Sequence, residues 1–572
     1  MANHPGVSVE LSRRRFLALS GAAVGVAAVG GTRLAASAAA SASGDAARRV
    51  VVVGAGLAGL TTALDLVDAG WDVTVFEARG RVGGRVKTNY FEPGLHAELG
   101  GESIDDNHHA MLAMLKRFGL STERRAPLKP YDAHVYRDGV REPLAVFVAQ
   151  RGGRVATDYF GFYDQLSAAS AGVDPMYPER AKNAAALDAR TLESFIAGAG
   201  LAPEAEFLVR TAFRGEYNAE PRDLSLLFIA QQTNGEDPGL TGAETMRIAG
   251  GNSQLPQRMA AALGDKVQLS RPVTRIAHGP GGVVVTAGGA SVPAAYAVLA
   301  APVPPLRNVA FDPPLPPAAA AMIAGLDLGT AAKVVTEYAV PFWQAEGFSG
   351  FTLTDLPFHI GWSPTDSYVP PQATGLLSQF ITGDAAVTAA NLTDAARIST
   401  FIAQLAQVYP ESVPLRTGRT ATMAWANEPY TRGGYAIFRP GQMAAFWPVL
   451  RNGVGRILFA GEHTEVLIGY MESAIRSGHR IAAQIGQPPA AGALGAASPP
   501  ASVQGEHLRR PSSAGSTLPA TGSTSLLLPA VGALGAGLLV RRAAAAAAAQ
   551  SAGADRSTSS TGTAPRTSRW SS

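Results

Sequence analysis

The sequence predicts an α/β fold with a Rossmann-like domain near its start, and three adjoining patterns support this fold class. Residues 50–53 are four consecutive valines, which is typical of a strand buried in a parallel sheet. The segment Gly54-Ala55-Gly56-Leu57-Ala58-Gly59 follows at once, and the apolar pattern of residues 60–69 then indicates a helix. Residues 71–76 alternate as a second strand, which ends in Glu77. Strand, glycine turn, helix and strand in this order form a βαβ unit.

Each glycine of this motif has a separate physical purpose in a dinucleotide site. Gly54 allows a tight turn, Gly56 lets the backbone approach a pyrophosphate, and Gly59 lets helix and strand pack closely. The helix that follows turns its N-terminus toward the phosphates. Glu77 is placed to accept hydrogen bonds from a ribose diol, which a purely structural purpose of the glycines would not explain. We therefore expect a bound dinucleotide.

The composition excludes several other functions. The 572 residues suffice for two or more domains, and 47% of them are hydrophobic. A net charge of +3 is too small and too dispersed to favour nucleic-acid binding. The chain has no cysteine, so disulfides, thiolate metal sites, cysteine nucleophiles and a cysteinyl-linked cofactor are excluded. His108 and His109 follow two aspartates, but residues 105–107 favour a capped helix start, so we expect no metal.

Both ends of the chain are expected to be processing segments rather than parts of the fold. The arginines and apolar run after Ser12, with small residues at 36–38, predict a twin-arginine export signal over residues 1–42; a short membrane anchor is the alternative. Residues 488–572 are rich in Ala, Gly, Ser and Pro and cannot build a core. Within them, Leu-Pro-Ala-Thr-Gly at 518–522, an apolar stretch and two arginines resemble a sortase cell-wall sorting signal, although a further Ala- and Ser-rich segment follows. Wall or membrane attachment and a disordered tail without function both stay open.

The residues after Glu77 distinguish FAD from a nicotinamide cofactor. Arg79-Gly80-Arg81-Val82-Gly83-Gly84-Arg85 resembles the extended fingerprint of flavoproteins, in which glycines and an arginine surround the pyrophosphate of FAD. Far downstream, residues 458–463 form a short apolar strand that leads into Gly461 and Glu462, and a helix begins near Met471. By this resemblance Glu462 binds a ribityl hydroxyl, and the helix N-terminus stabilises negative charge on the flavin ring.

Over residues 48–485 the chain resembles the flavin-dependent amine oxidases, which include monoamine, polyamine and L-amino acid oxidases. The resemblance also rests on Glu98-Leu99-Gly100-Gly101, where the family packs backbone against the flavin, and on residues 271–276, where the backbone of Val273 pairs with adenine. Some monoamine oxidases carry a cysteine that bonds to the flavin where this chain has Gly434, so FAD is expected to be noncovalently bound. The resemblance implies these FAD-binding residues: Gly54, Gly56, Leu57, Ala58, Gly59, Glu77, Ala78, Arg79, Gly83, Gly84, Arg85, Gly100, Gly101, Val273, Gly461, Glu462 and Met471.

The family's layout implies a discontinuous FAD-binding domain and a substrate domain of mixed sheet and helices. The FAD-binding domain is expected at residues 48–125, 247–330 and 445–487, and the substrate domain at 126–246 and 331–444. Within them the pattern predicts helices at 180–200 and 204–213 and strands at 266–276 and 282–286.

Three residues are expected to be catalytic. Lys333 lies in an apolar strand, where burial of its charge is unfavourable, and the family's lysine at this place holds a water beside flavin N5; the alternative is a lysine that reaches the surface at a strand end. Tyr435 and Tyr470 match two aromatic residues on either side of the substrate nitrogen, which steer the amine and align its Cα–H with N5. Ordinary core packing is the alternative for both. Trp425 matches a family tryptophan that lines or supports the pocket.

The resemblance implies oxidation of an amine by FAD. Hydride transfer from Cα to N5 gives an imine, which hydrolyses to an aldehyde or keto acid and ammonia, and O2 reoxidises the flavin to give hydrogen peroxide. One group of amino acid oxidases has an arginine where this chain has Ser103, so a primary amine is favoured over an L-amino acid, although Arg214 or Arg432 could bind a carboxylate. Glu102 and Glu216 either bind the distal ammonium of a diamine or are structural. A related monooxygenase or desaturase, and a surface binding module that retains an FAD fold, also stay open.

Overall fold

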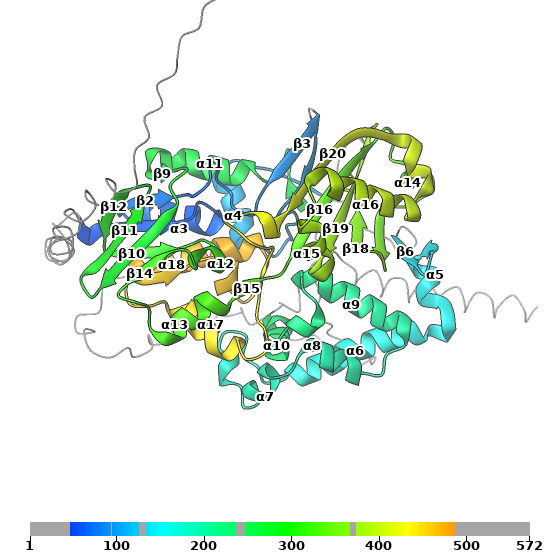
Figure 1. Cartoon of the computed structure of the whole chain (residues 1–572), viewed down its shortest axis with the longest axis horizontal. Helices are drawn as coiled ribbons and strands as arrows, with labels where there is room; N and C mark the ends of the chain where they lie inside the picture. Colours follow the sequence, from blue (N-terminus) through cyan, green and yellow to red (C-terminus); the bar gives the residue numbers. More distant parts are fainter. Residues whose placement is uncertain (1–45, 93, 125–132, 236–245, 366–372, 487–572) are drawn as a thin grey trace, which may run out of the picture.

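The computed structural model describes residues 46–92, 94–124, 133–235, 246–365 and 373–486 (Figure 1). The predicted export signal at 1–42 and the tail at 488–572, with its pentapeptide at 518–522, lie outside the described residues. Among the helices that are described, none is long and apolar enough to cross a membrane.

A five-stranded parallel sheet forms one half of the molecule, with strands from distant parts of the sequence. Its strand order is β22-β13-β1-β2-β9, and every neighbouring pair is parallel. The central strand β1 therefore pairs on one side with β2, its neighbour in sequence, and on the other with a segment far downstream. The strands are β1 (Arg49–Val53), β2 (Asp72–Phe76), β9 (Val267–Gln268), β13 (Tyr296–Leu299) and β22 (Ile457–Phe459).

Two helices pack beside this sheet at the glycine motif. Helix α3 (Leu57–Asp68) begins directly after Gly56, and α18 (Met471–Gly486) lies against it. The two helices approach closely, because a Cβ added at Gly478 of α18 would lie 2.7 Å from the carbonyl oxygen of Ala58. Buried apolar residues of β1, α3 and α18 share one hydrophobic core. The predicted α/β fold with a Rossmann-like domain is confirmed.

Several smaller sheets and helices accompany these elements. A four-stranded sheet has the order β12-β11-β10-β14, and three further pairs of short strands stand apart from it. These strands are β10 (Val273–Gly279), β11 (Gly282–Ala287), β12 (Ala290–Ala294) and β14 (Ala310–Asp312), then β3 (Thr88–Glu92) with β4 (Leu95–Glu98), β5 (Thr122–Arg124) with β8 (Met246–Ile248), and β15 (Asp327–Leu328) with β21 (Ala436–Ile437). The helices are α4 (His109–Arg117), α11 (Gln254–Leu263), α12 (Val303–Leu306), α13 (Pro317–Gly325) and α17 (Met443–Asn452).

A seven-stranded sheet of order β20-β16-β19-β18-β17-β6-β7 forms the second half. Strand β16 is buried along its whole length, and it sets Lys333 opposite Phe380 of β19 and Met423 of β20. The strands are β6 (Ala133–Arg137), β7 (Val140–Pro143), β16 (Ala331–Tyr338), β17 (Phe351–Thr354), β18 (Phe358–Trp362), β19 (Gly375–Thr382) and β20 (Arg416–Ala424). Helices α14 (Phe342–Ala345), α15 (Gly383–Ala390) and α16 (Asp394–Val408) accompany them.

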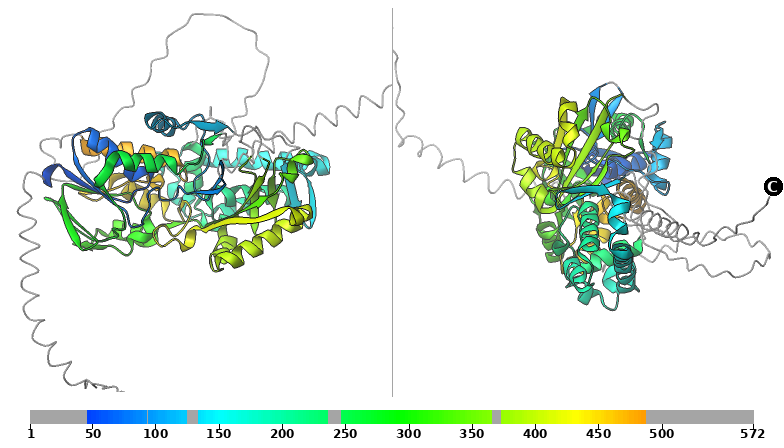
Figure 2. Two further views of the ribbon diagram at one scale, coloured as in Figure 1. Left: turned by 90° about the horizontal axis from the view of Figure 1, so that it is seen from above. Right: turned by 90° about the vertical axis from the view of Figure 1, so that its right-hand side faces the viewer.

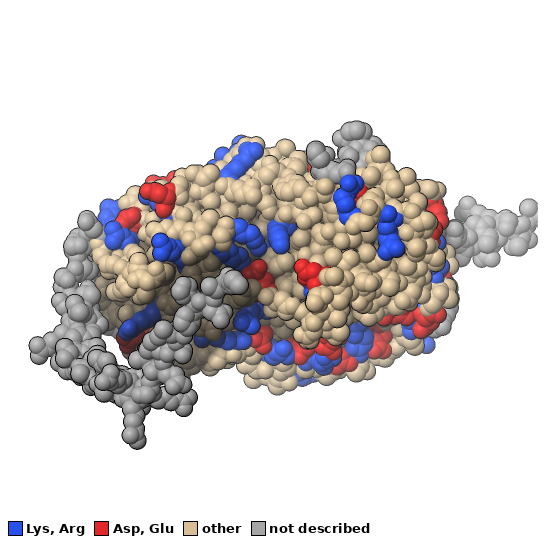
Figure 3. Space-filling view, turned by 45° about the horizontal axis from the view of Figure 1, so that its top comes forward, with Lys and Arg blue, Asp and Glu red and all other residues tan. Residues whose placement is uncertain are grey.

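A group of helices lies below the seven-stranded sheet in Figure 1. Its members are α5 (Leu144–Ala149), α6 (Arg154–Ser170), α7 (Ala184–Asp188), α8 (Leu192–Gly198), α9 (Pro203–Tyr217) and α10 (Leu226–Gly235). Figure 2 shows that the two sheet-based halves lie end to end along the molecule rather than stacked. On the face in Figure 3, acidic and basic side chains are interspersed. The predicted domain bounds stay a prediction.

Three local expectations are wrong. The helix expected at 180–200 is broken into α7 and α8, because the Thr191 hydroxyl caps a new helix by accepting from the Ser194 N–H at 3.1 Å. The strand expected at 266–276 is interrupted by Ser270, which has φ of 55°. Residues 105–107 do not cap α4. That helix begins at His109, and the Asp105 N–H donates instead to Nδ1 of His108 at 3.1 Å.

Candidate active site

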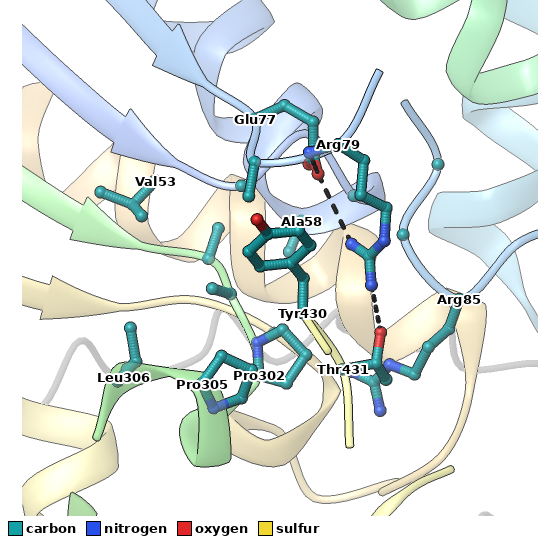
Figure 4. Close-up of a pocket in the computed structure, with 18 of the residues that line it drawn as sticks. Val53, Ala58, Glu77, Arg79, Arg85, Pro302, Pro305, Leu306, Tyr430 and Thr431 are labelled. Atoms are coloured by element: carbon teal, nitrogen blue, oxygen red, sulfur yellow. Dashed lines mark hydrogen bonds and ion pairs between the residues drawn. The ribbon is translucent and has the colours of Figure 1, made fainter. Parts of the chain in front are cut away.

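A cavity of about 350 Å³ opens at the carboxyl ends of β1 and β2 (Figure 4). This edge of a parallel sheet is where such folds bind their ligands. Most of the residues predicted to bind the dinucleotide line it, whereas Gly59 and Gly100 do not. The predicted residues in its wall are Gly54, Gly56, Leu57, Ala58, Glu77, Ala78, Arg79, Gly83, Gly84, Arg85, Gly101, Val273, Gly461, Glu462 and Met471. We call this the large cavity.

The glycines divide into those that face the large cavity and those that allow close packing. A Cβ added at Gly56 meets no atom within 4 Å, so its backbone is open to a ligand. A Cβ at Gly59 would lie 2.0 Å from the Gly54 carbonyl oxygen, and one at Gly100 would lie 1.8 Å from that of Arg85. Gly59 and Gly100 therefore keep neighbouring backbones together, while Gly56 leaves room for a phosphate at the start of α3. This arrangement fits a dinucleotide.

Glu77 is held in place by its own neighbourhood. The residue is 3% exposed, and its carboxylate accepts hydrogen bonds from the N–H groups of Ala55 at 2.8 Å and Arg79 at 2.9 Å. These bonds orient an acid at the end of β2, with the wall of the cavity on one side. A carboxylate has about four acceptor positions, so capacity remains for a ribose diol.

Arg79 connects this acid to a segment that sequence reasoning did not assign to the cofactor. Its guanidinium pairs with Glu428 at 3.2 Å and donates to the Thr431 hydroxyl, and it lies 5.7 Å from the centre of the Tyr430 ring. Figure 4 shows Tyr430 and Thr431 beside the cavity opposite Glu77. Residues 429–432 thus close one side of the large cavity, although they come from a loop far from the glycine motif.

Glu462, in the wall of the large cavity, joins three segments of the chain. Its carboxylate pairs with Arg85 at 2.7 Å and accepts from the N–H groups of Gly469 at 3.0 Å and Ala436 at 3.3 Å. Arg85 also donates to the Gly434 carbonyl at 2.6 Å. The loop that carries Tyr435 and the start of α18 are therefore fixed against the segment 79–85, which in turn bonds to the glycine motif through the Gly83 N–H and the Ala55 carbonyl at 2.9 Å.

A second cavity of about 80 Å³ adjoins the large one, and we call it the small cavity. Gly101, Tyr435, Gly469, Tyr470 and Met471 line both cavities, so they mark the junction. Lys333, Glu102, Ser103 and Glu216 line the small cavity alone. The structure thus brings the three residues predicted to be catalytic to one place, and their roles stay a prediction. Trp425 lies elsewhere: its indole N–H donates to the Leu99 carbonyl at 2.8 Å, behind Gly100.

Lys333 is a buried cation with a dedicated partner. The residue is 6% exposed, and its ammonium lies 3.0 Å from the Glu102 carboxylate. It also donates to the carbonyls of Glu98 at 3.1 Å and Gly100 at 3.2 Å. A lysine that reaches the surface is therefore the wrong alternative. The pairing satisfies the buried charge, as burial requires.

Glu102 is engaged by the same arrangement. Its second carboxylate oxygen accepts from the Trp362 indole N–H at 3.1 Å, while the first pairs with Lys333. The expectation that Glu102 holds a substrate ammonium is therefore not supported by this geometry. Its carboxylate neutralises the lysine instead.

Glu216 stands near the end of α9, where it meets the start of α18. The Tyr470 hydroxyl donates to its carboxylate at 3.3 Å. Burial, and after it the charge of Asp105, raises the pKa of Glu216 to about 7, although the bond from Tyr470 acts in the other direction. His108 packs edge-on against Tyr470, with ring centres 5.4 Å apart, and burial lowers its pKa to about 4.

Comparison with known proteins decides the family. The family model described as flavin containing amine oxidoreductase matches residues 57–486. This chain belongs to that family. A candidate flavin-containing monoamine oxidase of Mycobacterium tuberculosis is 32% identical over 460 residues, which cover 76% of this chain and 96% of that protein. An L-amino acid dehydrogenase of Synechocystis is 28% identical over 466 residues, covering 76% and 94%. The solved structure of putrescine oxidase bound to putrescine superposes with a TM-score of 0.70 at 27% identity, covering 77% and 98%.

The chain is therefore a flavin-containing amine oxidase, and its small cavity can be examined for groups that bind a carboxylate. Arg214 is engaged by Glu220 at 2.7 Å, and the exposed Arg432 lines only the large cavity. Among the described residues that line the small cavity there is no arginine, and the lysine there is already paired. Among all the residues that the structure describes, no group of three or more His, Asp or Glu side chains is placed to hold a metal ion.

Sequence reasoning missed several residues of this amine oxidase's site. Trp362 and Phe380 line the small cavity, and their rings lie 4.8 and 5.7 Å from the Lys333 ammonium. No local pattern could reveal them, because they reach the lysine through strand pairing in the seven-stranded sheet. Residues 429–432 lie close before Tyr435 in the sequence, and this proximity was the available signal.

Proposed function

We propose that this amine oxidase binds FAD noncovalently and oxidises a primary amine, with O2 as the electron acceptor. The observation that carries the proposal is the junction of the two cavities, where a dinucleotide site adjoins the cavity of Lys333, Tyr435 and Tyr470. Bound FAD would supply the acceptor for a hydride from the amine Cα and the means to reduce O2 to hydrogen peroxide. The imine released then hydrolyses to an aldehyde and ammonia.

The two tyrosines would orient the substrate. Both line the junction, so a group between their rings also faces the dinucleotide site. The electron-rich faces of the rings attract an amine, and a narrow slot restricts the directions in which its Cα–H can point. Tyr435 is fixed from behind, because a Cβ at Gly469 would lie 3.2 Å from its ring.

Lys333 would hold a water at the reacting centre. Its ammonium is already oriented by two carbonyls and the Glu102 carboxylate, and it borders the small cavity. An ammonium has three N–H donors, and all three have a partner here, so a water held by Lys333 would take the place of one of the two carbonyls. The pairing with Glu102 keeps the net charge at this place close to zero.

Noncovalent binding is supported by what surrounds Gly434. The chain has no cysteine, and a Cβ at Gly434 would lie 2.5 Å from the side-chain nitrogen of Asn218. A larger side chain at this position would have to displace that asparagine. Retention of FAD therefore depends on the glycine motif, Glu77 and the residues 429–432 that close the cavity.

Oxidation of an L-amino acid is the second candidate function, and the relative named as an L-amino acid dehydrogenase favours it. Ser103 and the lack of an arginine among the described residues of the small cavity argue against it, since a carboxylate would find no cation free to pair with it. A screen of hydrogen peroxide release across monoamines, diamines and L-amino acids separates the two. A response to L-amino acids alone would overturn the preference for amines.

The colour of the purified protein tests directly whether it is an enzyme. We expect it to be yellow as purified and to bleach without oxygen when a substrate amine is added. A yellow protein that no amine or amino acid bleaches would instead support a surface binding module that retains an FAD fold.

We further propose export by the twin-arginine route, with attachment to the cell wall or membrane through the tail. The proposal rests on the sequence signals at 1–42 and 518–522. Replacement of Arg13 and Arg14 by lysine should retain the protein inside a bacterium that has this route. Unchanged release into the medium would overturn the export proposal.

A further inference from the structure

We propose that Glu216 is a specificity-determining residue that binds the second ammonium of an aliphatic diamine. The inference rests on the proposed function, because it assumes that the reacting amine occupies the junction of the two cavities. It concerns the far end of the substrate, which extends from that junction into the small cavity.

The position of Glu216 follows from which residues the cavities share. The junction contains Tyr435 and Tyr470, whereas Glu216 lines the small cavity only. Its carboxylate lies at the hydroxyl end of Tyr470, with 3.3 Å between the two oxygens. A substrate whose amine lies between the tyrosine rings therefore directs its other end toward the part of the cavity that Glu216 borders.

The charges in the small cavity favour a cation at that end. Lys333 and Glu102 neutralise each other at 3.0 Å. The other ionisable carboxyl group in the wall is Glu216, which forms an ion pair with no cation among the described residues. The remaining described residues of the wall include Trp362, Phe380 and Ile468, which suit a methylene chain. A short methylene chain with an ammonium at each end would therefore fit between the tyrosines at the junction and Glu216.

The neighbours of Glu216 strengthen the preference. Asp105 is also buried and adds a second negative charge to the region, while its neighbour His108 stays neutral at pH 7 because burial lowers its pKa to about 4. Arg214 precedes Glu216 by two residues on α9, but its guanidinium is engaged by Glu220 at 2.7 Å. An incoming ammonium therefore meets acidic groups without a competing cation from α9.

The pH dependence follows with a definite sign. Burial raises the pKa of Glu216 to about 7, so its carboxylate is only partly ionised at neutral pH in the free enzyme. Binding of a second ammonium requires the ionised form. The KM for a diamine should therefore fall as the pH rises from 6 to 8, and the KM for the matched monoamine should lack this component.

The test compares 1,4-diaminobutane with butylamine and 1,5-diaminopentane with pentylamine on the FAD-bound enzyme. Hydrogen peroxide release gives kcat/KM for the wild type, for Glu216→Gln and for the control Glu206→Gln. Glu206 is on the same helix but pairs with Arg210 at 2.7 Å at the surface. We expect the wild type to favour each diamine, and Glu216→Gln to lower kcat/KM by about 10- to 100-fold for diamines and less than about threefold for monoamines. The control should match the wild type.

Four outcomes would overturn the inference. Equal wild-type kcat/KM for a diamine and its monoamine would do so while leaving the proposed function intact. An equal loss for both substrates in Glu216→Gln, with FAD content and thermal midpoint unchanged, would show that the residue only positions Tyr470. If no amine reduces the flavin, the proposed function and this inference fail together. Should Glu216→Gln not fold, the wild-type pH profiles decide alone: parallel profiles for diamine and monoamine contradict the inference.

Discussion

Three carboxyl groups near the small cavity have different states because their partners differ. Glu102 is paired with Lys333 at 3.0 Å and remains a charge partner. Glu98 is fully buried, and burial raises its pKa to about 7 although Asn252 and Thr88 donate hydrogen bonds to it. Glu216 also has a pKa of about 7, but it faces the cavity. The cavity thus combines one neutralised pair with one acid that can gain a charge.

At the residue scale, replacement of Lys333 separates its catalytic and structural contributions. Lys333→Met should lower turnover by about 100-fold, the usual order for the loss of one positioned group at a reacting centre. It should also lower the free energy of unfolding by about 3 kcal/mol, because Glu102 is left buried without its cation. Anaerobic flavin reduction, reoxidation by O2 and thermal unfolding measure the three quantities.

The double variant Lys333→Met with Glu102→Gln supplies the control for that experiment. It removes both charges, so stability should return toward the wild type while turnover stays low. Lys116→Met, at an exposed position of α4, should change neither. Normal turnover in Lys333→Met would refute the role assigned to the lysine.

At the scale of elements, the parts that sequence reasoning predicts are those whose pattern is local. The strand, glycine turn and helix from β1 to α3 are contiguous, so each residue type could be interpreted from its neighbours. The sheet that carries Lys333 is different, because β16 pairs with β19 and β20, which follow it by tens of residues. Strand pairing depends on tertiary packing more than on local propensity. Trp362 and Phe380 were therefore out of reach, although the family resemblance identified Lys333 itself.

The two interruptions that the sequence did not reveal, in the helix expected at 180–200 and the strand expected at 266–276, each depend on a single residue. Thr191 starts a new helix through its hydroxyl, and Ser270 turns the chain with a positive φ that serine seldom adopts. Neither residue differs by type from many that lie within helices or strands. The paired state of Glu102 was also hidden, since it requires Lys333 and Trp362 to approach from two strands of the distant sheet.

Two glycines of one motif should respond differently to the same added methyl group. Gly56 has φ of −77°, and its Cβ would point into open space in the large cavity, so Gly56→Ala should fold normally but bind FAD at least about 10-fold more weakly. Gly59→Ala should instead lower the free energy of unfolding by about 2 kcal/mol or more, because its Cβ would lie 2.0 Å from the Gly54 carbonyl oxygen.

Calorimetry of the FAD-free proteins and quenching of FAD fluorescence on titration measure these two effects separately. The two variants act as controls for each other, since the chemical change is the same. If both lost stability equally, Gly56 would not face an open phosphate position. If both kept wild-type affinity for FAD, the assignment of the motif to the pyrophosphate would be wrong.

For the whole molecule, the active site depends on contacts between distant segments. Contacts of Arg85 and Glu462 with each other, with the Gly434 carbonyl and with the Gly469 N–H tie the segment 79–85 to the loop of Tyr435 and to α18. The large and small cavities share residues from these same segments. Unfolding should therefore release the cofactor and dismantle the substrate cavity in one step.

This dependence predicts how FAD leaves. Without a covalent bond, heat or acid precipitation should transfer the yellow colour completely to the supernatant, where FAD can be identified by its fluorescence and mass. The chain has no cysteine to form the usual thioether, and Asn218 fills the space beside Gly434. Colour that stays with the washed precipitate would show a covalent link and refute noncovalent binding.

The stability of the whole molecule should decrease in mild acid. Burial lowers the pKa of five histidines from 6.5 to about 3 or 4, so between these values they bind fewer protons folded than unfolded, and acid favours the unfolded chain. Two carboxyl groups whose pKa is raised from 4.5 to about 7 act in the opposite direction over the same range. Five groups against two leave at most about three protons in favour of unfolding near pH 5.5, which is on the order of 4 kcal/mol for each pH unit there. The groups are His96, His108, His134, His359 and His463 against Glu98 and Glu216.

Thermal unfolding at constant ionic strength and saturating FAD measures this balance. The midpoint should be several degrees lower at pH 5.5 than at pH 7. His134→Gln should reduce the difference, because it removes one of the five histidines that take up a proton on unfolding. The substitution leaves the site intact, since His134 lines neither cavity and lies at hydrogen-bond distance from Tyr409. A midpoint that is equal at the two pH values, or higher at pH 5.5, would mean that the buried carboxyl groups outweigh the histidines.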